Sequence, residues 1–514
     1  MTEHYLDRLA KTINENWDQP ALTDFYLTED GSSLDTSRGN HYTYGEMYAE
    51  LCCVAELLTS LGLQKGDHIA ICGANSAHWT IAYLAIAAYQ GVAVTILHSQ
   101  SPEDIAHQID FSDAKALFTD DELWAEIKGL SISQIEHVIS LADWQILRGK
   151  EIKIINLKSQ ITNRDCHFST GEPDNLAMIC FTSGSTSKPK GVMHSYRSIT
   201  GGIEGSKATL PNVQRQRYVS ILPLAHIFGL IGDIDHLLNA HHIFHVCSID
   251  KRAVFIALMS NAPYIFVSVP QVLEMLYSLR PNFLDIFTQL GIQGITNGGA
   301  RLNPEIESYI IGKKFPLVSL YGTTEGMIFS GSKSSEYKSG SCGKIVENMT
   351  CCIASNGEIL VKGENVMLGY YKDPEATAAK IDSDGWLHTG DKGHLDEDGY
   401  LYVEGRLEQD MIVLPNGENI HPEDIERKIN ALPEVKESIV LARDGKLVTI
   451  VVPSSESRET SETRASSPSS SLRRNILRAV NPSLPLFSQL YDVEITDQPL
   501  ARTEKQTIKR YLYS

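Results

Sequence analysis

Short apolar runs that alternate with helical patterns restrict the fold of this chain more than any other feature. The capping box T-Y-G-E at Thr43 opens a stretch with apolar residues at helical spacing up to Leu61. The strand-like run HIAICGA follows, then a second helical stretch from about Ser76 and the β-branched run GVAVTIL. Strands that alternate with helices of about ten to fifteen residues predict βαβ units around a parallel sheet.

The same alternation continues for most of the chain and then changes. It recurs at NLAMICFTSGS, RYVSILPLAH, APYIFVSV, GIQGITNGGA and PLVSLYGTTE. From about residue 340, short strands separated by the turn signals SNGE, DSDG and DEDG predict a small β-rich region. After Arg406 a hairpin, a helix at PEDIERKINAL and two strands follow. We therefore expect an α/β fold in which a large N-terminal domain (1–405), with βαβ-type sheets and the β-rich region, precedes a small, mobile α+β domain (406–514).

Composition narrows the class of protein. The 514 residues carry a formal net charge of −19, which argues against binding along a nucleic-acid backbone but not against a local nucleotide site. Nine Cys without a C-x-x-C pair predict reduced thiols in a cytoplasmic protein. The stretch WTIAYLAIAAYQGVAVTIL is interrupted at Gln90 and Gly91, so it predicts a buried helix and strand rather than a membrane span. We expect at most peripheral membrane contact, and the oligomeric state stays open.

One segment of the small domain is compositionally unlike the rest. About residues 454–471, Ser, Thr, Glu and Arg dominate, and such a segment buries too little apolar surface to order itself. We expect a flexible surface loop there, with a regulatory phosphorylation segment as the alternative.

The stretch FTSGSTSKPKG, residues 181–191, concentrates Gly, hydroxyl and Lys side chains. It follows an apolar strand and precedes MHSYRSI, which we expect to be helical. A strand-to-helix turn of this kind can aim backbone N–H groups and hydroxyls at an anion, and its lysines add positive charge. The segment does not fit the G-x-x-x-x-G-K-[ST] phosphate loop, but a phosphate remains the expected ligand.

Further motifs follow in order: NGGARL, SLYGTTEG, GWLHTGDKGHLDEDGYLYVEGR and ENIHPEDIE. With the 181–191 stretch they strongly resemble the adenylate-forming superfamily of acyl-CoA synthetases, luciferases and peptide-synthetase adenylation domains. Within that superfamily, the motifs PLAHIFG and PNGENIHPEDIE most resemble those of the fatty acyl-CoA ligases. The resemblance implies that ATP and a carboxylic acid react to an acyl-adenylate and pyrophosphate, and that the acyl group then passes to a thiol, usually that of CoA.

The resemblance also implies roles for particular residues. An attacking carboxylate and the phosphates repel each other, so the site needs cations and donors more than a base. Thr324 would contact the α-phosphate, and Glu325 would hold Mg²⁺ with Thr182 as a candidate second ligand. His226 would touch the substrate carboxylate or gate the acyl pocket. The remaining nucleotide contacts would come from Thr182, Ser183, Gly184, Ser185, Thr186 and Lys190 at the phosphates, from Gly298, Gly299, Ala300, Tyr321, Gly322 and Thr323 around adenine, and from Asp391 and Arg406 at the ribose.

Two positions depart from the pattern of the superfamily. The catalytic lysine expected near the C-terminus is replaced by Thr507, so Lys505 or Lys509 substitutes or adenylation is slow. The hinge between the domains contains one extra residue, and either Glu408 or Gln409 would pivot. We therefore predict an AMP-forming acyl-CoA ligase for a fatty or similar acid that uses ATP, Mg²⁺ and CoA. The alternatives are an acyl-AMP ligase that loads a carrier protein and a catalytically weakened acyl- or nucleotide-binding module.

Overall fold

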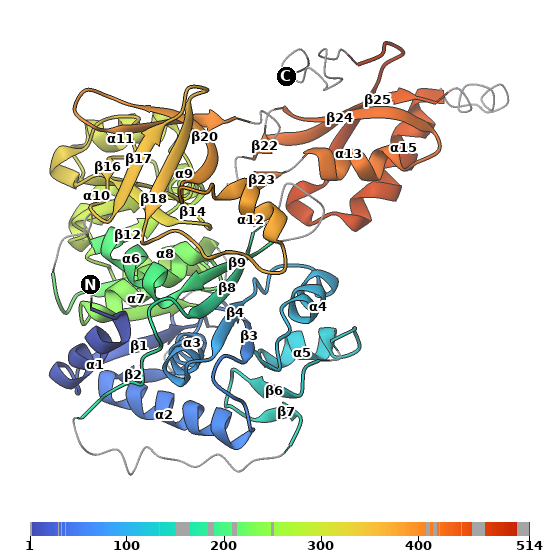
Figure 1. Ribbon diagram of the computed structural model, residues 1–514. Helices are drawn as coiled ribbons and strands as arrows, with labels where there is room; N and C mark the ends of the chain where they lie inside the picture. Colours follow the sequence, from blue (N-terminus) through green and yellow to red (C-terminus); the bar gives the residue numbers. More distant parts are fainter. Residues whose placement is uncertain are drawn as a thin grey trace. The chain divides into compact units, whose positions relative to one another are not determined.

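The computed structural model describes most of the chain, and its described residues form two compact units. The large unit comprises Met1–Thr182 and Pro189–Glu404, and the small unit contains Gly405–Ser514. Both mix helices and strands (Figure 1), which confirms the predicted α/β class. The described residues are 3–28, 30–31, 33–35, 38–132, 134–150, 165–182, 190–207, 213–247, 251–407, 412–414, 419–420, 422–443, 445–454, 468–500 and 513.

An eight-stranded sheet with helices on both faces forms the first half of the large unit (Figure 1). In β3, Ile69 and Ile71 face a core that also contains apolar residues of α2 and α3, whereas Ala70 and Cys72 face a second core with residues of α4. This alternation is why β3 reads as an uninterrupted apolar run. The strand order is β19-β9-β8-β4-β3-β5-β6-β7, over β3 (His68–Cys72), β4 (Val92–Thr95), β5 (Ala116–Thr119), β6 (His137–Ser140), β7 (Ile146–Arg148), β8 (Leu176–Thr182), β9 (Lys190–Ser195) and β19 (Gly369–Tyr370), with helices α2 (Tyr44–Ser60), α3 (Ala77–Tyr89), α4 (Pro102–Phe111) and α5 (Asp121–Ile127).

The helix signals in the sequence are confirmed where they were strongest. Thr43 Oγ1 accepts a hydrogen bond from the backbone N–H of Glu46, whose carboxylate accepts one from the backbone N–H of Thr43, so the capping box forms. Ser76 caps α3. An additional helix, α1 (Tyr5–Glu15), lies near the N-terminus. Residues Ala77–Ala87 of α3 are buried inside the protein. Among the described residues, no helix combines the length and apolarity that crossing a membrane would require.

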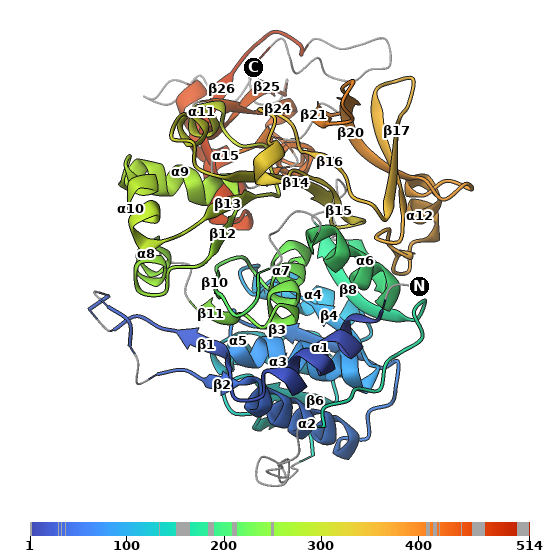
Figure 2. The same cartoon turned by 90° about the vertical axis from the view of Figure 1, so that its left-hand side faces the viewer.

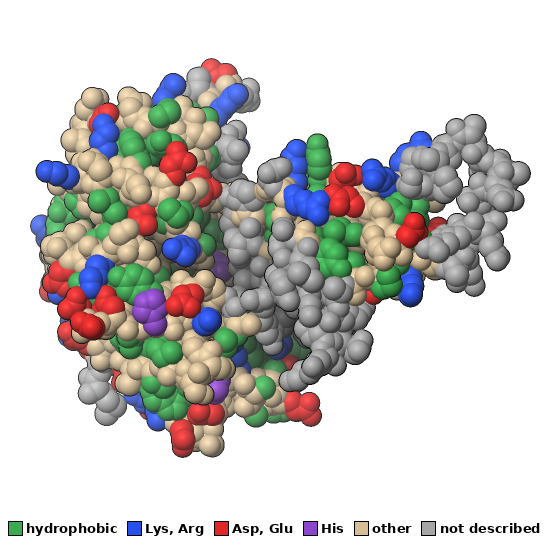
Figure 3. Space-filling view, turned by 90° about the horizontal axis from the view of Figure 1, so that it is seen from above, with side chains coloured by type: hydrophobic (Ala, Val, Ile, Leu, Met, Phe, Trp, Pro, Cys, Tyr) green, Lys and Arg blue, Asp and Glu red, His purple; other side chains and the backbone are tan. Residues whose placement is uncertain are grey.

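Three further sheets complete the large unit. Helices α8, α9 and α10 gather beside β12 and β13 (Figure 2), and their apolar residues share one core with those strands. Acidic and basic side chains are interspersed over the visible face of this unit rather than gathered into one field (Figure 3). The five-stranded sheet contains β12 (Ile265–Ser268), β13 (Gly294–Asn297), β14 (Leu317–Thr323), β15 (Met327–Gly331) and β16 (Lys344–Ile345), near α8 (Lys251–Ser260), α9 (Pro270–Leu279), α10 (Phe283–Leu290) and α11 (Pro304–Gly312). The sheet β10-β11-β1-β2 contains β1 (Pro20–Phe25), β2 (His41–Thr43), β10 (Arg217–Ser220) and β11 (His242–Val246), with α6 (Tyr196–Lys207) and α7 (Ile227–Leu238) in the same unit. The predicted β-rich region forms β17 (Met349–Ile353), β18 (Glu358–Gly363), β20 (Leu387–Leu395) and β21 (Leu401–Arg406), with α12 (Pro374–Lys380).

The small unit has its own core and sheet. Buried residues of α13, β24, β25, α15 and β26 form one apolar cluster, so this unit has the α+β character that was predicted. The segment expected to be a flexible loop falls outside the described residues from 455 to 467, and α15 begins at Pro468. The elements are β22 (Ile412–Val413), β23 (Asn419–Ile420), α13 (Pro422–Asn430), β24 (Val435–Arg443), β25 (Lys446–Pro453), α15 (Pro468–Val480) and β26 (Leu490–Ile495).

One expectation near the phosphate motif is wrong. The residues MHS were expected in a helix, but they belong to β9, and α6 begins only at Tyr196. β9 pairs antiparallel with β8 from Leu176 opposite Ser195 to Thr182 opposite Lys190. The stretch 183–189 therefore joins two paired strands, and no helix begins directly after it. An anion there would depend on loop N–H groups, hydroxyls and lysine charge rather than on a helix dipole.

Candidate active site

A tight hairpin between β14 and β15 presents Thr324 and Glu325 at its turn. The hairpin requires Gly322, because a Cβ at that position would lie 1.6 Å from the carbonyl oxygen of Met327. Met327 itself has a φ of 58°, in the left-handed region that non-glycine residues seldom adopt. The motif YGTTEG thus encodes a turn that only this close backbone approach can make.

Tyr370 contacts both Lys190 and Glu325 beside this turn. The Nζ atom of Lys190 lies 4.9 Å from the centre of the Tyr370 ring, and the Tyr370 hydroxyl donates a hydrogen bond of 2.8 Å to Glu325 Oε1. β19 places Tyr370 there because it pairs antiparallel with β9, with Tyr370 opposite Val192. The structure therefore brings together two residues that the sequence assigned to phosphate and metal binding, Lys190 and Glu325, with Thr182 directly across the strand pair from Lys190.

The oxygen donors beside this turn fit a hard divalent cation. Mg²⁺ prefers carboxylate and phosphate oxygens and is commonly held by one or two protein carboxylates plus the phosphates of a substrate. Glu325 supplies a carboxylate and Thr182 a hydroxyl, and within the described part of the chain no group of three or more His, Cys, Asp or Glu could hold a metal alone. An ion bound at Glu325 would take its remaining ligands from nucleotide and water, and it would neutralise phosphate charge.

A buried histidine, His194, contacts the backbone of the β14–β15 turn. His194 Nε2 lies 2.8 Å from the carbonyl oxygen of Thr324, and its Nδ1 lies 3.3 Å from Ser198 Oγ. Burial lowers the pKa of His194 to about 4, so the ring is neutral at pH 7. Since a carbonyl can only accept, Nε2 carries the proton and donates to Thr324. This bond fixes the backbone between Thr324 and Glu325.

Tyr321 and Asp391 form the other side of the site. Tyr321 lies on β14, Asp391 on β20, and the Tyr321 hydroxyl donates a hydrogen bond of 2.6 Å to Asp391 Oδ2. Asp391 is 6% exposed and Tyr321 is half-buried. The residues expected at the ribose and at adenine are therefore neighbours. Each carboxylate oxygen can accept more than one hydrogen bond, so this contact is compatible with a vicinal diol on Asp391.

The glycines of NGGARL adjoin the His226 segment. A Cβ on Gly298 would lie 2.8 Å from the ring of Phe228, and one on Gly299 would lie 3.5 Å from Val269. Gly299 has a φ of +81°, which explains the glycine there. His226 is the N-cap of α7, two residues before Phe228, and it is exposed to solvent.

Some of the expected site residues are not described at all. Ser183, Gly184, Ser185 and Thr186 lie outside the described residues, as do Lys505, Lys509, Thr507 and both hinge candidates. Arg406 ends β21, but its side chain is not described. The roles assigned to all of these residues stay predictions. Ala300 and Thr323 lie on the predicted segments, and the backbone carbonyl of Ala300 lies 3.4 Å from Asn297 Nδ2.

Two residues at the site were missed by the sequence analysis. Tyr370 follows a glycine in an otherwise unremarkable stretch, and only the pairing of β19 with β9 brings it to Glu325. His194 lies 130 residues before Thr324 and is part of a strand that was expected to be helical. Once β9 is assigned as a strand, the spacing of two residues between His194 and the buried Val192 would have placed His194 on a buried face.

Comparisons with known proteins show the family of the chain. Residues 9–371 match the AMP-binding enzyme family, and residues 409–513 match the AMP-binding enzyme C-terminal domain. The probable CoA ligase CCL5 of Humulus lupulus is 26% identical over 435 residues, which cover 79% of this chain and 77% of the relative. The long-chain-fatty-acid–CoA ligase FadD13 of Mycobacterium tuberculosis is 26% identical over 420 residues, which cover 79% and 81%.

A solved structure shares the fold over nearly the whole chain. The o-succinylbenzoate CoA synthetase MenE of Bacillus subtilis, bound to a product analogue, aligns with a TM-score of 0.76 at 23% identity over 98% of this chain and 97% of that one. The family match and the fold point the same way. The chain therefore belongs to the AMP-binding enzyme family, within the adenylate-forming superfamily and close to its AMP-forming acyl-CoA ligases.

Proposed function

We propose that this protein is an ATP-dependent, AMP-forming acyl-CoA ligase that activates a fatty or similarly apolar carboxylic acid in the cytoplasm. The observation that carries the proposal is the contact of Lys190 and Glu325 with Tyr370, at the turn that follows β14, whose Tyr321 pairs with Asp391. These groups supply the cation, the metal-binding carboxylate and the ribose acceptor that transfer of an adenylyl group requires. Two relatives named as CoA ligases support the acceptor.

The chemistry asks the protein for charge neutralisation and alignment. The carboxylate of the acid attacks the α-phosphorus of ATP, the bond to the bridging oxygen breaks, and pyrophosphate leaves with the electron pair. Lys190 would stabilise the charge on the leaving phosphates, and Thr324, held through His194, would donate to the α-phosphate. Mg²⁺ at Glu325 would supply further neutralisation. The second step moves the acyl group from AMP to the sulfur of CoA.

An apolar acid is favoured by the surroundings of His226. Phe228, Val269 and Leu320 lie against the glycines that follow β13. The acyl chain would lie among these side chains with its carboxylate toward His226. The name of FadD13 supports a fatty acid, whereas other relatives are named as ligases for coumarate or succinylbenzoate, so aromatic acids belong in the same test.

Thr507 favours a second candidate, a ligase with weakened adenylation or a binding module. We propose that 1–405 holds the nucleotide and the acid, that 406–514 closes over them about Glu408 or Gln409, and that Lys505 or Lys509 supplies the missing charge. Loss of one well-placed charge in a preorganised site costs roughly 10²–10³ in rate. The Thr507→Lys variant should therefore adenylate faster than the wild type.

The test is pyrophosphate release from Mg·ATP with straight-chain acids of several lengths and with aromatic acids. We expect release with apolar acids, and a thioester product when CoA is added. A phosphopantetheine-bearing carrier protein that is acylated in preference to CoA would establish the carrier-loading alternative. Binding of ATP by calorimetry without any pyrophosphate would establish the binding module. Failure to bind either ATP or an acyl-AMP analogue at millimolar concentration would overturn the proposal.

A further inference from the structure

The segment that leads to His226 is clamped by one side chain, Asn75. Its amide nitrogen donates a hydrogen bond of 2.7 Å to the carbonyl oxygen of Leu222, and its amide oxygen accepts one of 2.9 Å from the backbone N–H of Leu224. The side chain thus pairs with the backbone as a neighbouring strand would. Both bonds grip residues two and four positions before His226, and none of the site roles described above uses Asn75.

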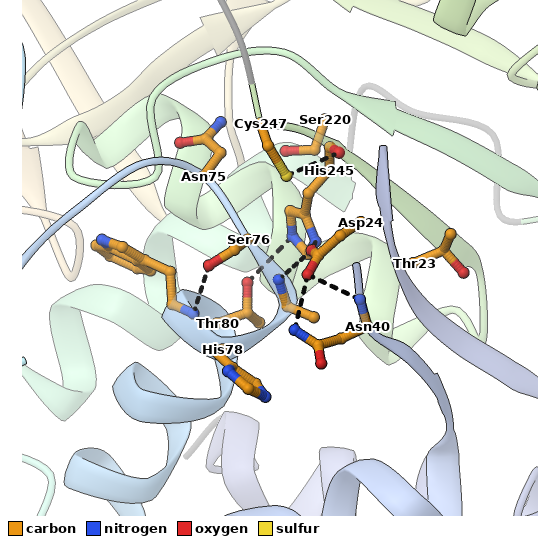
Figure 4. Close-up of polar contacts among 12 residues, drawn as sticks. Thr23, Asp24, Asn40, Asn75, Ser76, His78, Thr80, Ser220, His245 and Cys247 are labelled. Atoms are coloured by element: carbon orange, nitrogen blue, oxygen red, sulfur yellow. Dashed lines mark hydrogen bonds and ion pairs between the residues drawn. The ribbon is translucent and has the colours of Figure 1, made fainter. Parts of the chain in front are cut away.

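The residues that follow Asn75 belong to a buried polar network (Figure 4). Asn75 precedes Ser76, the N-cap of α3, whose hydroxyl accepts from the backbone N–H of Trp79 at 3.1 Å. The backbone N–H of Ala77 donates a bond of 2.6 Å to Asp24 Oδ1, and the other Asp24 oxygen accepts from Asn40. Asp24 is 1% exposed, so the start of α3 is fixed to β1 inside the protein.

The same network reaches α7, which His226 caps. His245 Nε2 on β11 donates a bond of 2.8 Å to Asp233 Oδ2 on α7, and Ser220 Oγ donates one of 2.7 Å to Asp233 Oδ1. His245 and Asp233 are fully buried, and Asp24 Oδ1 lies 3.9 Å from His245 Nδ1. Asp233 lies seven residues, two helical turns, after His226. The helix is therefore anchored at Asp233 and its leading segment at Asn75.

The loop between these anchors leaves little room for adjustment. A Cβ on Gly229 would lie 2.4 Å from the carbonyl oxygen of Pro223, so the segment folds tightly back on the first turn of α7. Thr95 Oγ1 donates a bond of 3.1 Å to the carbonyl oxygen of Ala225. A change at Asn75 would release residues 222–224 while Thr95 and Asp233 still hold the helix. The backbone N–H of His226 donates a bond of 3.0 Å to the carbonyl oxygen of Pro223, inside the released segment, so the change would reach His226 through this bond.

We propose that Asn75 is a positioning residue of the acid-binding side of the site, which sets the placement of His226 through Leu222 and Leu224. The functional consequence rests on the proposed ligase activity. Asn75 makes its two bonds with an N–H donor on one side and an oxygen acceptor on the other. Aspartate has the same shape, but its carboxylate would face the carbonyl oxygen of Leu222 with no donor. A protonated aspartic acid restores the donor, and the contact with the carbonyl oxygen of Leu222, 2.7 Å away in the Asn75 pairing, favours this form above the ordinary pKa of aspartate.

The test is the Asn75→Asp variant, assayed for acid-dependent pyrophosphate release at pH 8 and pH 5. A misplacement of about 1 Å at a reacting group costs on the order of 100-fold. We expect kcat/KM for the acid to fall by that order at pH 8 and the variant-to-wild-type ratio to recover at least tenfold at pH 5, with KM for ATP within twofold of the wild type. The titratable groups packed around the site, Asp24, Asp120, Asp233, His226 and His245, are present in both proteins, so the ratio reports only the new carboxylate and its coupling to them.

Two controls separate positioning from general damage. Asn75→Ala removes both bonds without adding charge, so its loss should persist at both pH values, and it serves the same comparison if the aspartate variant does not fold. Asn356→Asp makes the matched charge change at an exposed turn, where the side-chain oxygen that accepts from Glu358 is retained, and it should behave as the wild type. Wild-type kcat/KM in Asn75→Ala, or equal losses for the acid and ATP in all variants, would overturn the proposal.

A readout without substrate keeps this test independent of the proposed activity. The ring carbon resonance of His226 in protein labelled at histidine Cε1 can be assigned with His226→Gln. We expect it to be displaced in Asn75→Asp at pH 8 and to coincide with the wild type at pH 5. Superimposed resonances at pH 8 would show that His226 does not depend on Asn75, whether or not any acid is activated. An inactive wild type with a displaced resonance would instead count against the ligase alone.

Discussion

The position of the Glu325 carboxylate is fixed by contacts of individual atoms. One carboxylate oxygen accepts from the Tyr370 hydroxyl, and the backbone before it is fixed by His194. The side chain is thus oriented from two sides before any ion or nucleotide binds. A preorganised carboxylate of this kind loses little freedom when it takes up a cation, so its charge should matter more than its packing.

We expect Glu325→Gln to lower the rate of adenylation by roughly 10²–10³. The glutamine oxygen can still accept from Tyr370, so the turn should keep its shape and the unfolding temperature should change little. Pyrophosphate release measured against Mg²⁺ concentration checks this. Tyr370→Phe keeps the carboxylate and is the matched control, with a smaller loss expected. An unchanged Mg²⁺ dependence in Glu325→Gln would place the metal elsewhere.

At the element scale, the hairpin of β14 and β15 depends on glycine at position 322, where there is no room for a side chain. The Cβ of alanine at position 322 would meet the carbonyl oxygen of Met327 at 1.6 Å, so the strands would have to separate. We expect Gly322→Ala to cost about 2 kcal/mol or more of unfolding free energy and most of the adenylation activity, because Thr324 and Glu325 move with the turn. Urea unfolding and pyrophosphate release measure the two effects.

Gly312 provides the comparison for that substitution. It ends α11, and a Cβ there would have nothing within 4 Å. Alanine is favoured over glycine in helices by up to about 1 kcal/mol, so Gly312→Ala should leave stability equal or slightly raised. If both glycine variants lost the same stability, the close approach in the hairpin would not be the cause.

The elements also show what the sequence could and could not predict. Apolar runs and capping signals identified α2, α3, β3 and β4, because those patterns are local. The last three residues of β9, MHS, were expected to be helical since the antiparallel pairing of β9 with β8 is a tertiary contact that no local pattern carries. The motifs named Lys190, Glu325 and Asp391, whereas Tyr370 and His194 required the pairing of distant strands.

At the scale of the whole molecule, two buried groups give stability opposite dependences on pH. Burial lowers the pKa of His194 from 6.5 to about 4. Its contribution is full above pH 6.5 and is lost as pH falls toward 4, because the unfolded chain binds the proton first. Burial raises the pKa of Asp235 on α7 from 3.8 to about 7. Its contribution is full below pH 3.8 and is lost as pH rises toward 7.

Two substitutions should separate these slopes. Each pKa unit corresponds to about 1.4 kcal/mol, so His194→Gln should lose about 2 kcal/mol less than the wild type between pH 6.5 and pH 5. Asp235→Asn should gain about 2 to 3 kcal/mol on the wild type between pH 5 and pH 8, since the amide has no proton to release. Urea unfolding of the large unit at the three pH values measures both. Glutamine can still donate to Thr324 and asparagine keeps an acceptor oxygen, so both variants keep the packing of the wild type. If the unfolding free energy of both variants changed with pH as it does in the wild type, neither His194 nor Asp235 would be desolvated in solution as its burial implies.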